Sequence, residues 1–222
     1  MQDPPRPEHP RPQLVRDRWL NLNGEWEFEI DRGDSGHERG LLARALSARI
    51  LVPFAPESPL SGIGEQDFLQ AVWYRRSFTV PAGWADAHAH LRFQAVDYDA
   101  TVWCDGREVG RHRGGATPFG CDLGRLEPGS THEILVRARD DHRPAQPRGK
   151  QSQRLRPWSV FYPRTTGIWQ TVWLEALPET WLDRPRFTPD LPGGMLRLEQ
   201  RVRGPIRHHR VRATVRDGEG IV

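Results

Sequence analysis

The feature that most constrains the fold of this chain is a series of short segments in which apolar and polar residues alternate. In residues 20–30, large apolar side chains alternate with Glu25, Glu27 and Glu29. This period of two is that of a β-strand with one buried face, so we expect the glutamates to face water. Further short apolar or alternating segments lie at residues 48–56, 71–81, 89–112, 131–141 and 167–177.

Turn residues separate these segments at short intervals. The chain contains 21 glycines and 20 prolines, and Asp105–Gly106 predicts a tight hairpin turn. Only residues 38–49 have a helix-like pattern, so the strands lack the intervening helices that a parallel sheet requires. The pattern therefore predicts an all-β protein, built as an antiparallel sandwich or jelly roll.

The last segment of this series has apolar bulk on both of its faces. Trp169 and Trp173 alternate with Ile168 and Val172 in residues 167–177. A strand of this kind lies inside a two-layer fold or beneath a neighbouring domain. We therefore expect this strand to be covered on both sides.

The distribution of residues along the chain predicts three regions. Residues 1–13 are rich in proline and are expected to be an extended or disordered tail. Residues 14–178 contain the strands of the sandwich. After Pro178 the pattern changes, and residues 179–222 contain three further short strands. Because so few short strands cannot close a sandwich, we expect residues 179–222 to be the truncated start of a second β-domain.

The composition argues against several classes of protein. Apolar residues make up 36% and charged residues 27% of the chain, as in soluble globular proteins. The net charge is only +3, Lys150 is the sole lysine, and the arginines are dispersed among acids, which argues against a nucleic-acid partner. The N-terminal residues lack the apolar core of a secretory signal, and no run is long enough to cross a membrane. We therefore expect a cytoplasmic protein without a membrane partner.

Cysteine and histidine give no sign of a cofactor. Cys104 and Cys121 are expected to be half-buried strand thiols, because two cysteines make no disulfide framework. His88 and His90 would point to one side of a strand, but no third ligand is evident, and the other histidines lack metal-site spacing. The sequence therefore predicts neither a metal nor another cofactor.

Two further groups of acids lie near strand ends. Asp97 and Asp99 flank Tyr98 between two expected strands, and Asp140 and Asp141 follow another strand. Aspartates beside turns commonly cap the backbone in water, and this interpretation is favoured over ligand binding for the first group.

Four motifs occur in order along the chain: LNGEWEF (22–28), VWYRRSFTVP (72–81), LRFQAVDYDATVWCDGREVGRHRGGATPF (91–119) and PRTTGIWQTVWLE (163–175). Together they resemble the N-terminal part of glycoside hydrolase family 2, which includes β-galactosidases, β-glucuronidases and β-mannosidases. The resemblance implies a jelly-roll, galactose-binding-like sugar-binding domain, then an immunoglobulin-like sandwich, then a catalytic (β/α)8 barrel. Residues 179–222 would be the first strands of an incomplete immunoglobulin-like sandwich.

The resemblance also implies that this chain is a non-catalytic module. A retaining glycosidase needs two carboxylates about 5–5.5 Å apart. In the family both lie on the barrel, whose pattern this chain lacks, so we expect no catalytic residue here. The module would brace the barrel and contribute loops near the sugar site of an enzyme that hydrolyses β-glycosides. One departure is Phe161, which stands where β-galactosidases and β-glucuronidases have an aspartate that reaches the sugar.

The loop at residues 140–151 offers several polar groups. Arg148, Lys150 and Gln151 could donate hydrogen bonds to sugar hydroxyls or carboxylates. The alternatives are a solvated loop or contact with the barrel. A role in a site or an interface is favoured, because functional groups concentrate on loops held by rigid scaffolds.

The next segment adds aromatic and cationic candidates. Trp158 and Tyr162 could stack on a sugar ring, although packing beneath the loop is favoured. Arg164 could pair with a carboxylate, and the resemblance places its turn on the surface that meets the barrel. The candidates for carbohydrate binding or the barrel interface are together Asp140, Asp141, Arg148, Lys150, Gln151, Trp158, Tyr162 and Arg164.

Two alternative functions remain open at this stage. Jelly rolls often bind glycans without chemistry, so the chain could be an autonomous carbohydrate-binding module. It could also be an interaction domain without a ligand, which would require its tryptophan-rich face to be exposed.

Overall fold

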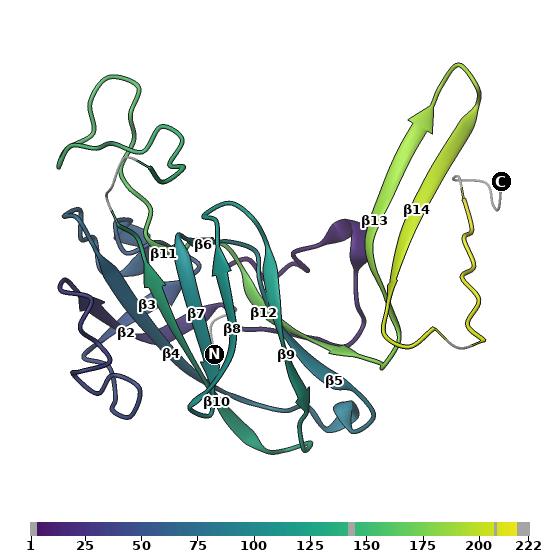
Figure 1. Ribbon diagram of the computed structural model, residues 1–222, viewed down its shortest axis with the longest axis horizontal. Coiled ribbons are helices and arrows are strands. Elements are labelled where there is room, and N and C mark those ends of the chain that lie inside the picture. Colours follow the sequence, from purple (N-terminus) through teal and green to yellow (C-terminus); the bar gives the residue numbers. More distant parts are fainter. Residues whose placement is uncertain (1–3, 142–144, 207, 217–222) are drawn as a thin grey trace. The chain divides into compact units, whose positions relative to one another are not determined.

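The computed structural model describes residues 4–141, 145–206 and 208–216. It is almost entirely antiparallel β-structure, which confirms the predicted fold class (Figure 1). The described part contains short 3-10 helices at Pro12–Leu14 (η1), Pro59–Ser61 (η2) and Ala82–Trp84 (η3) but no α-helix. None of its helices is long and apolar enough to span a membrane. The chain divides into two compact units, residues 1–177 and 178–222.

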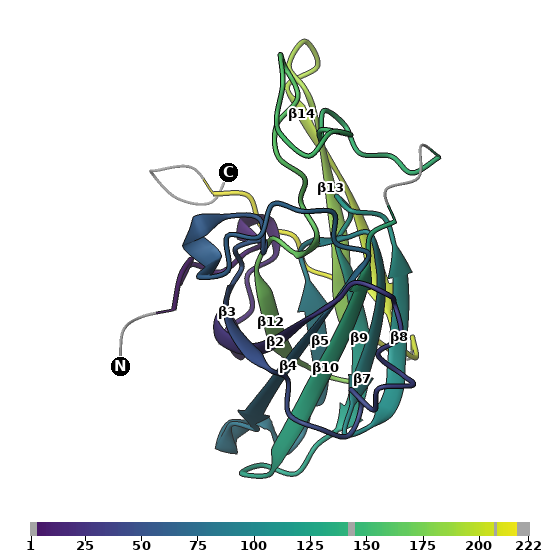
Figure 2. The same ribbon diagram turned by 90° about the vertical axis from the view of Figure 1, so that its left-hand side faces the viewer.

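The first unit is a sandwich of two main antiparallel sheets (Figure 2). The larger sheet has the order β3 (Ala48–Val52), β2 (Gly24–Asp31), β4 (Ala71–Thr79), β10 (Thr131–Arg139), β7 (Asp99–Cys104) and β8 (Arg107–Arg113). The smaller sheet has the order β1 (Trp19–Asn21), β12 (Val172–Leu177), β5 (His88–Phe93) and β9 (Phe119–Arg125). A separate short antiparallel sheet pairs β6 (Val96–Asp97) with β11 (Gly167–Ile168).

The inner faces of the two sheets form one hydrophobic core. Trp26 and Tyr74 from the larger sheet are in the same buried cluster as Leu91 and Leu174 from the smaller one. The rings of Trp26 and Tyr74 meet edge to face, with centroids 6.4 Å apart and an interplanar angle of 86°. Because side chains alternate across a strand, this core accounts for the apolar half of each predicted pattern.

The thiols of Cys104 and Cys121 are free and are buried more fully than the half-buried state that the sequence predicts. Their burial raises both pKa values, to about 12 for Cys104 and about 11 for Cys121. The two thiols are therefore protonated near neutral pH and act as small apolar groups.

The predicted helix at residues 38–49 is not formed. Residues 32–47 form a loop of turns that covers the outer face of the larger sheet. Leu41 is fully buried against Trp73 and Trp103, whose rings stack with centroids 5.6 Å apart. Gly40, with a φ of 71°, interrupts the helical conformation. The periodic leucines therefore anchor an irregular loop rather than one face of a helix.

The expectation that Glu25, Glu27 and Glu29 form a wet face is wrong for Glu29. That side chain is buried beneath the same loop and accepts hydrogen bonds from Arg39 and, at 2.7 Å, from Arg44. The alternation correctly predicts which residues share the face. It does not show that arginines from the next loop cover that face and neutralise its buried carboxylate.

The N-terminal segment covers the outer face of the smaller sheet over β1 and β12. The guanidinium of Arg11 lies 5.3 Å from the ring of Trp173, which is completely buried. Asn21 and Asn23 donate their side-chain amides to the carbonyls of Arg6 and Pro5, each at 2.9 Å. Over its described residues the proline-rich segment is therefore extended along the sandwich. The expected cover on both faces of β12 is present.

The second unit is a hairpin of two antiparallel strands, β13 (Trp181–Asp190) and β14 (Met195–Arg203). Phe187, Leu196 and Leu198 are exposed on it. The third predicted strand is not formed among the described residues 208–216. The assignment of residues 179–222 as the start of an immunoglobulin-like sandwich stays a prediction.

Replacing Glu29 by glutamine is expected to lower the free energy of unfolding by about 2 kcal/mol at pH 7, because two arginines lose their charged partner. Hydrogen bonding from Arg44 holds the pKa of Glu29 below its ordinary value of 4.5. Its contribution is therefore present above pH 4.5 and is lost as the pH falls through the lowered pKa. Urea unfolding at pH 7 and at pH 3 measures the difference between the wild type and the variant, which should be smaller at pH 3.

The matched control for this prediction is Glu108→Gln. Glu108 forms an exposed pair with Arg111 at 2.8 Å, and its loss should change the free energy of unfolding by less than about 0.5 kcal/mol. Equal effects of the two substitutions would contradict the importance of the covered face.

Candidate functional site

The segment that joins β10 to β11 extends over one end of the sandwich (Figure 1). The structure describes residues 140, 141 and 145–166 of this segment, so the part of the predicted donor loop at 142–144 lies outside the described residues. The segment has almost no regular strand structure of its own. Side chains must therefore satisfy much of its backbone.

One arginine fixes this segment to the sandwich. Arg164 is buried, and burial lowers its pKa. Its guanidinium donates to four backbone carbonyls, those of Gln66, Ser152, Arg154 and Leu155. It also lies 4.1 Å from the ring centroid of Phe68. The side chain of Arg164 points into the domain and holds the loop in place, so it is not itself contact surface. That its turn meets the barrel stays a prediction.

Three buried carboxylates lie beneath the segment. Thr166 links two of them: its backbone N–H donates to Glu57 at 3.2 Å and its hydroxyl donates to Asp140 at 3.3 Å. The third, Asp97, accepts a hydrogen bond of 2.8 Å from the amide of Gln151. Asp97 is therefore not the solvated turn cap that the sequence suggests.

Burial is the main cause of a raised pKa at all three carboxylates. It raises the pKa of Glu57 from 4.5 to about 7. The pKa of Asp97 rises to about 6, through burial and the nearby charge of Asp140. Burial also raises the pKa of Asp140. The guanidinium of Arg148, 3.3 Å from the Asp140 carboxylate, opposes this increase. This end of the sandwich therefore holds acids that can exchange protons near neutral pH.

A cavity of about 530 Å³ opens above these carboxylates. Its walls come from Asp97–Tyr98, from the loop at 114–117, from residues 147–151, and from Tyr162, Thr165 and Trp169. The walls combine aromatic rings with the guanidinium of Arg148 and the amide of Gln151. That combination suits a polar ligand with apolar faces, such as a sugar.

Gly115, in the HRGGATPF sequence at 112–119, is required by this wall. A Cβ at position 115 would collide with the carboxylate of Asp97. The carbonyl of Gly115 in turn accepts a hydrogen bond of 2.7 Å from Trp169. The loop thus lies against both the strand of Asp97 and the segment of Trp169, and it closes one side of the cavity.

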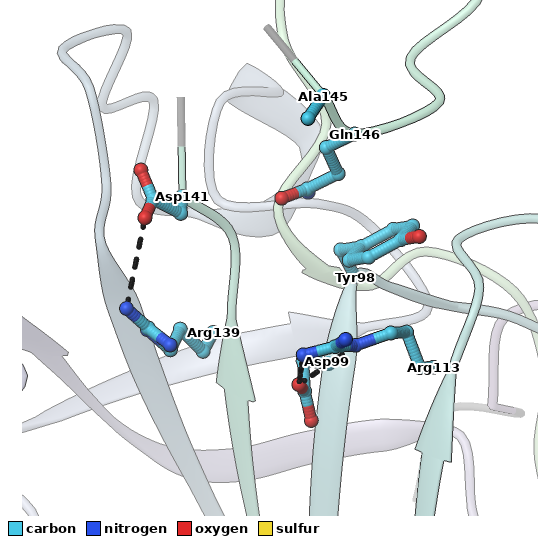
Figure 3. A pocket seen from close by; sticks show the side chains of 7 residues that line it. All are labelled: Tyr98, Asp99, Arg113, Arg139, Asp141, Ala145 and Gln146. Carbon is cyan, nitrogen blue, oxygen red and sulfur yellow. Dashed lines mark hydrogen bonds and ion pairs between the residues drawn. The ribbon is translucent and has the colours of Figure 1, made fainter. Parts of the chain in front are cut away.

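A smaller cavity of about 240 Å³ is also lined by Tyr98 (Figure 3). Two ion pairs form its floor: Arg113 with Asp99 at 2.8 Å, and Arg139 with Asp141 at 3.6 Å. Gln146 enters from above. Because both arginines already have carboxylate partners, this cavity is close to neutral in charge.

Residues 64–137 match the family described as glycosyl hydrolases family 2, sugar binding domain. The chain is 30% identical over 180 residues to a β-galactosidase of Thermoanaerobacter pseudethanolicus. This match covers 78% of this chain and 22% of that protein. It is 29% identical over 130 residues to a β-glucuronidase of Paenibacillus borealis. This match covers 57% of this chain and 22% of that protein. The chain thus spans about a fifth of the length of these relatives.

The fold agrees with these sequence matches. The crystal structure of Ruminococcus gnavus β-glucuronidase superposes with a TM-score of 0.67 at 22% identity, over 86% of this chain and 34% of that one. The chain carries the sugar-binding domain of glycosyl hydrolase family 2. The resemblance predicted from the four motifs is confirmed.

The matched part of the sugar-binding domain covers only some of the cavity walls. It includes Asp97, Tyr98 and the loop at 114–117, and it ends before the segment at 145–166. The walls that carry Arg148, Gln151 and Tyr162 are supplied by residues outside the matched range. We expect such a segment to set the differences between related domains.

The predicted candidates separate into three groups in this sugar-binding domain. Arg148, Gln151 and Tyr162 line the larger cavity, and Asp141 lines the smaller one. Asp140 and Arg164 are buried and support the loop from below. Lys150 and Trp158 are exposed on the segment and line neither cavity.

The aromatic candidates do not pack beneath the loop as favoured from the sequence. Trp158 is 42% exposed and Tyr162 is 48% exposed. Trp158 stacks on Phe161 with ring centroids 5.0 Å apart, and the guanidinium of Arg154 lies 4.0 Å from its centroid. The phenolic oxygen of Tyr162 accepts a hydrogen bond of 3.2 Å from the backbone N–H of Lys150.

Sequence reasoning missed Glu57, Tyr98 and Trp169 as site residues. Tyr98 and Trp169 lie within the recognised motifs, so their motif positions were an available signal. Glu57 lies in a loop before η2 and reaches the site only through the fold. No local pattern marks it.

Among the described residues, two groups bring three possible metal ligands within 4.8 Å of one another. One is His88, His90 and Asp122, and the other is Cys104, Asp105 and His132. Neither group lines the two cavities described above.

Replacing Glu57 by glutamine is expected to make stability less sensitive to pH between about 5 and 8. Since the folded-state pKa is raised to about 7, the contribution of Glu57 is fully present below 4.5 and is lost as the pH rises through 7. The loss amounts to roughly 3 kcal/mol in the wild type. Chemical unfolding at a series of pH values measures it. The exposed Glu38 provides a control in Glu38→Gln, and an undiminished pH dependence in the Glu57 variant would refute the prediction.

Proposed function

We propose that this chain is the non-catalytic N-terminal module of a glycoside hydrolase that cleaves the O-glycosidic bonds of β-glycosides in carbohydrate metabolism. The family match and the relatives named β-galactosidase and β-glucuronidase support this reaction class. The described residues form β-sandwich structure and contain no (β/α)8 barrel. The hydrolytic carboxylates of the proposed enzyme would then lie outside this module, and its partner would be a barrel in the same protein.

The cavity of about 530 Å³ is the observation that carries the role of the module. Its donors are pre-positioned, because the amide of Gln151 is fixed by Asp97 and by the backbone N–H of Thr165 at 3.0 Å. Arg148 is likewise held by Asp140. Such fixed polar groups bind a ligand with little loss of side-chain entropy. We infer that this end of the sandwich lends its loops to the edge of a sugar site.

The exposed part of the segment suits the proposed contact with the barrel. Lys150, Trp158 and Tyr162 lie on its outer surface, where an aromatic ring and a cation could meet another domain. The proposed organisation is a tail at residues 1–13, the jelly roll at 14–178 and the start of an immunoglobulin-like sandwich at 179–222. A cytoplasmic location stays a prediction from the sequence.

Of the two alternatives, an autonomous carbohydrate-binding module has more support than an interaction domain without a ligand. The interaction domain requires an exposed tryptophan-rich face. Trp26, Trp73 and Trp173 are instead almost completely buried. The cavity, by contrast, would serve a binding module as well as a module that assists a barrel.

The purified 222-residue chain is expected to show no hydrolysis of p-nitrophenyl β-glucuronide, β-galactoside or β-mannoside. Both carboxylates of a retaining glycosidase would lie on the proposed barrel rather than in this module. Release of p-nitrophenol is followed over hours, with an active β-glycosidase as positive control. Turnover that co-purifies with the chain and is abolished by Glu57→Gln or Asp97→Asn would contradict a non-catalytic role.

Sugar binding by the cavity is expected to depend on Tyr162 and not on Trp158. Both aromatic side chains are exposed on the same segment, but only Tyr162 lines the cavity. Saturation-transfer NMR with methyl β-glycosides compares the wild type with Tyr162→Ala, which should lose about 1 kcal/mol of binding free energy. Trp158→Ala is the matched control and should leave binding unchanged. Loss of binding in the Trp158 variant alone would place the sugar on the outer surface instead.

A further inference from the structure

The outer face of the smaller sheet carries a group of ligand atoms that the proposed function does not use. His88 and His90 lie two residues apart on β5, so their side chains share one face. Asp122 lies on the adjacent strand β9, directly opposite His90 in the register. The Oδ1 atom of Asp122 is 3.6 Å from His88 Nδ1 and 3.7 Å from His90 Nε2.

The carboxylate is oriented by an irregularity in the strand pairing. The register of β5 and β9 shifts between His88 and His90, so that His88 lies opposite Arg125. Within this irregular stretch Gly124 has a φ of 77°, and its backbone N–H donates to Asp122 Oδ1 at 2.8 Å. This bond turns the carboxylate back toward the two histidines. Backbone support of a ligand oxygen is typical of a built metal site.

Two of the three separations between the ligand atoms fit a small transition-metal ion, and all three atoms lie within 4.8 Å of one another. Zinc binds imidazole nitrogen and carboxylate oxygen at about 2.0–2.2 Å, so two ligands of a tetrahedral ion lie about 3.4 Å apart. The observed 3.6 and 3.7 Å are close to that separation. We propose that His88, His90 and Asp122 form a binding site for a divalent transition-metal ion, with zinc as the best match. Since half of the Asp122 side chain is exposed, solvent can supply the remaining ligand.

Two arginines lie near the site, and one of them, Arg125, is opposite His88 in the register. Arg92 follows on the same face of β5, but its Nε lies 3.3 Å from the carboxylate of the buried Glu175. Glu175 is opposite His90 on β12 and also accepts a hydrogen bond of 2.8 Å from Trp173. His90 therefore lies between two strands that each present a carboxylate. The positive charge of Arg92 is balanced by one of them.

The proposed ion would join an edge strand to its neighbour. β9 is the last strand of the smaller sheet, and its pairing with β5 is interrupted by the register shift. Two ligands from β5 and one from β9 would hold the strands together at this weak point. This role is independent of the proposed sugar site.

The second group of possible ligands is a poorer candidate. His132 Nδ1 lies 2.6 Å from Asp105 Oδ2, and its Nε2 lies 2.7 Å from the hydroxyl of Ser130. Both ring nitrogens are therefore engaged in short hydrogen bonds. A metal ion would have to displace one of them, which makes His132 a suitable control.

The test is calorimetric titration of the 222-residue chain, without a histidine tag, with ZnCl2. One zinc ion per chain is expected for the wild type. His88→Gln and Asp122→Asn should each weaken binding by at least about tenfold, whereas His132→Gln should not. Circular dichroism checks that each variant folds. Absence of zinc binding by the wild type, or its loss in His132→Gln alone, would overturn the proposal.

Proton NMR of the wild type provides a second readout, for which variants are needed only to assign the signals. The imidazole signals of two histidines should shift together at one equivalent of zinc. His88→Gln and His90→Gln spectra identify those signals. Shifts confined to other histidines, such as His208 and His209 near the end of the chain, would show that the ion binds elsewhere.

Discussion

The backbone of an irregular loop needs hydrogen-bond donors that no neighbouring strand provides, and in this domain one guanidinium supplies them. Arg164 donates to four carbonyls from two separate stretches of chain, while its planar face packs on Phe68. A lysine could not replace it, because an ammonium group lacks the planar array of donors. The positions of Arg148, Gln151 and Tyr162 all depend on this anchor, since they lie on the loop that it holds.

The same principle organises both outer faces of the sandwich. Glu29 under the loop at 32–47 and Glu175 under the N-terminal segment are buried carboxylates, and each is paired with arginine. Buried carboxylates of this kind are tolerable only with charged or multiple hydrogen-bond partners. Irregular chain can therefore cover a sheet where a helix would otherwise be required. This explains why a chain with almost no helix can bury tryptophans on both sides of its sheets.

The strands and their apolar faces could be predicted from the sequence, because a period of two depends only on strand geometry. The segments that cover those faces could not be predicted from the sequence. Residues 38–49 have a helical pattern of leucines, yet Arg39 and Arg44 pair with Glu29 from an irregular loop. Glu29 itself follows the alternation of an exposed residue. Local periodicity reports which side chains share a face, whereas the solvent exposure of that face depends on segments distant in the sequence.

The site shows the same limit at the level of single residues. Asp140 could be singled out because it ends a strand, but its partner Thr166 and the neighbouring Glu57 come from other loops. Those contacts hold three buried carboxylates close together, and burial is the main cause of their raised pKa values, which lowers stability near neutral pH. Because destabilising polar groups tend to persist where they serve a function, this concentration at the loop end supports a ligand site there.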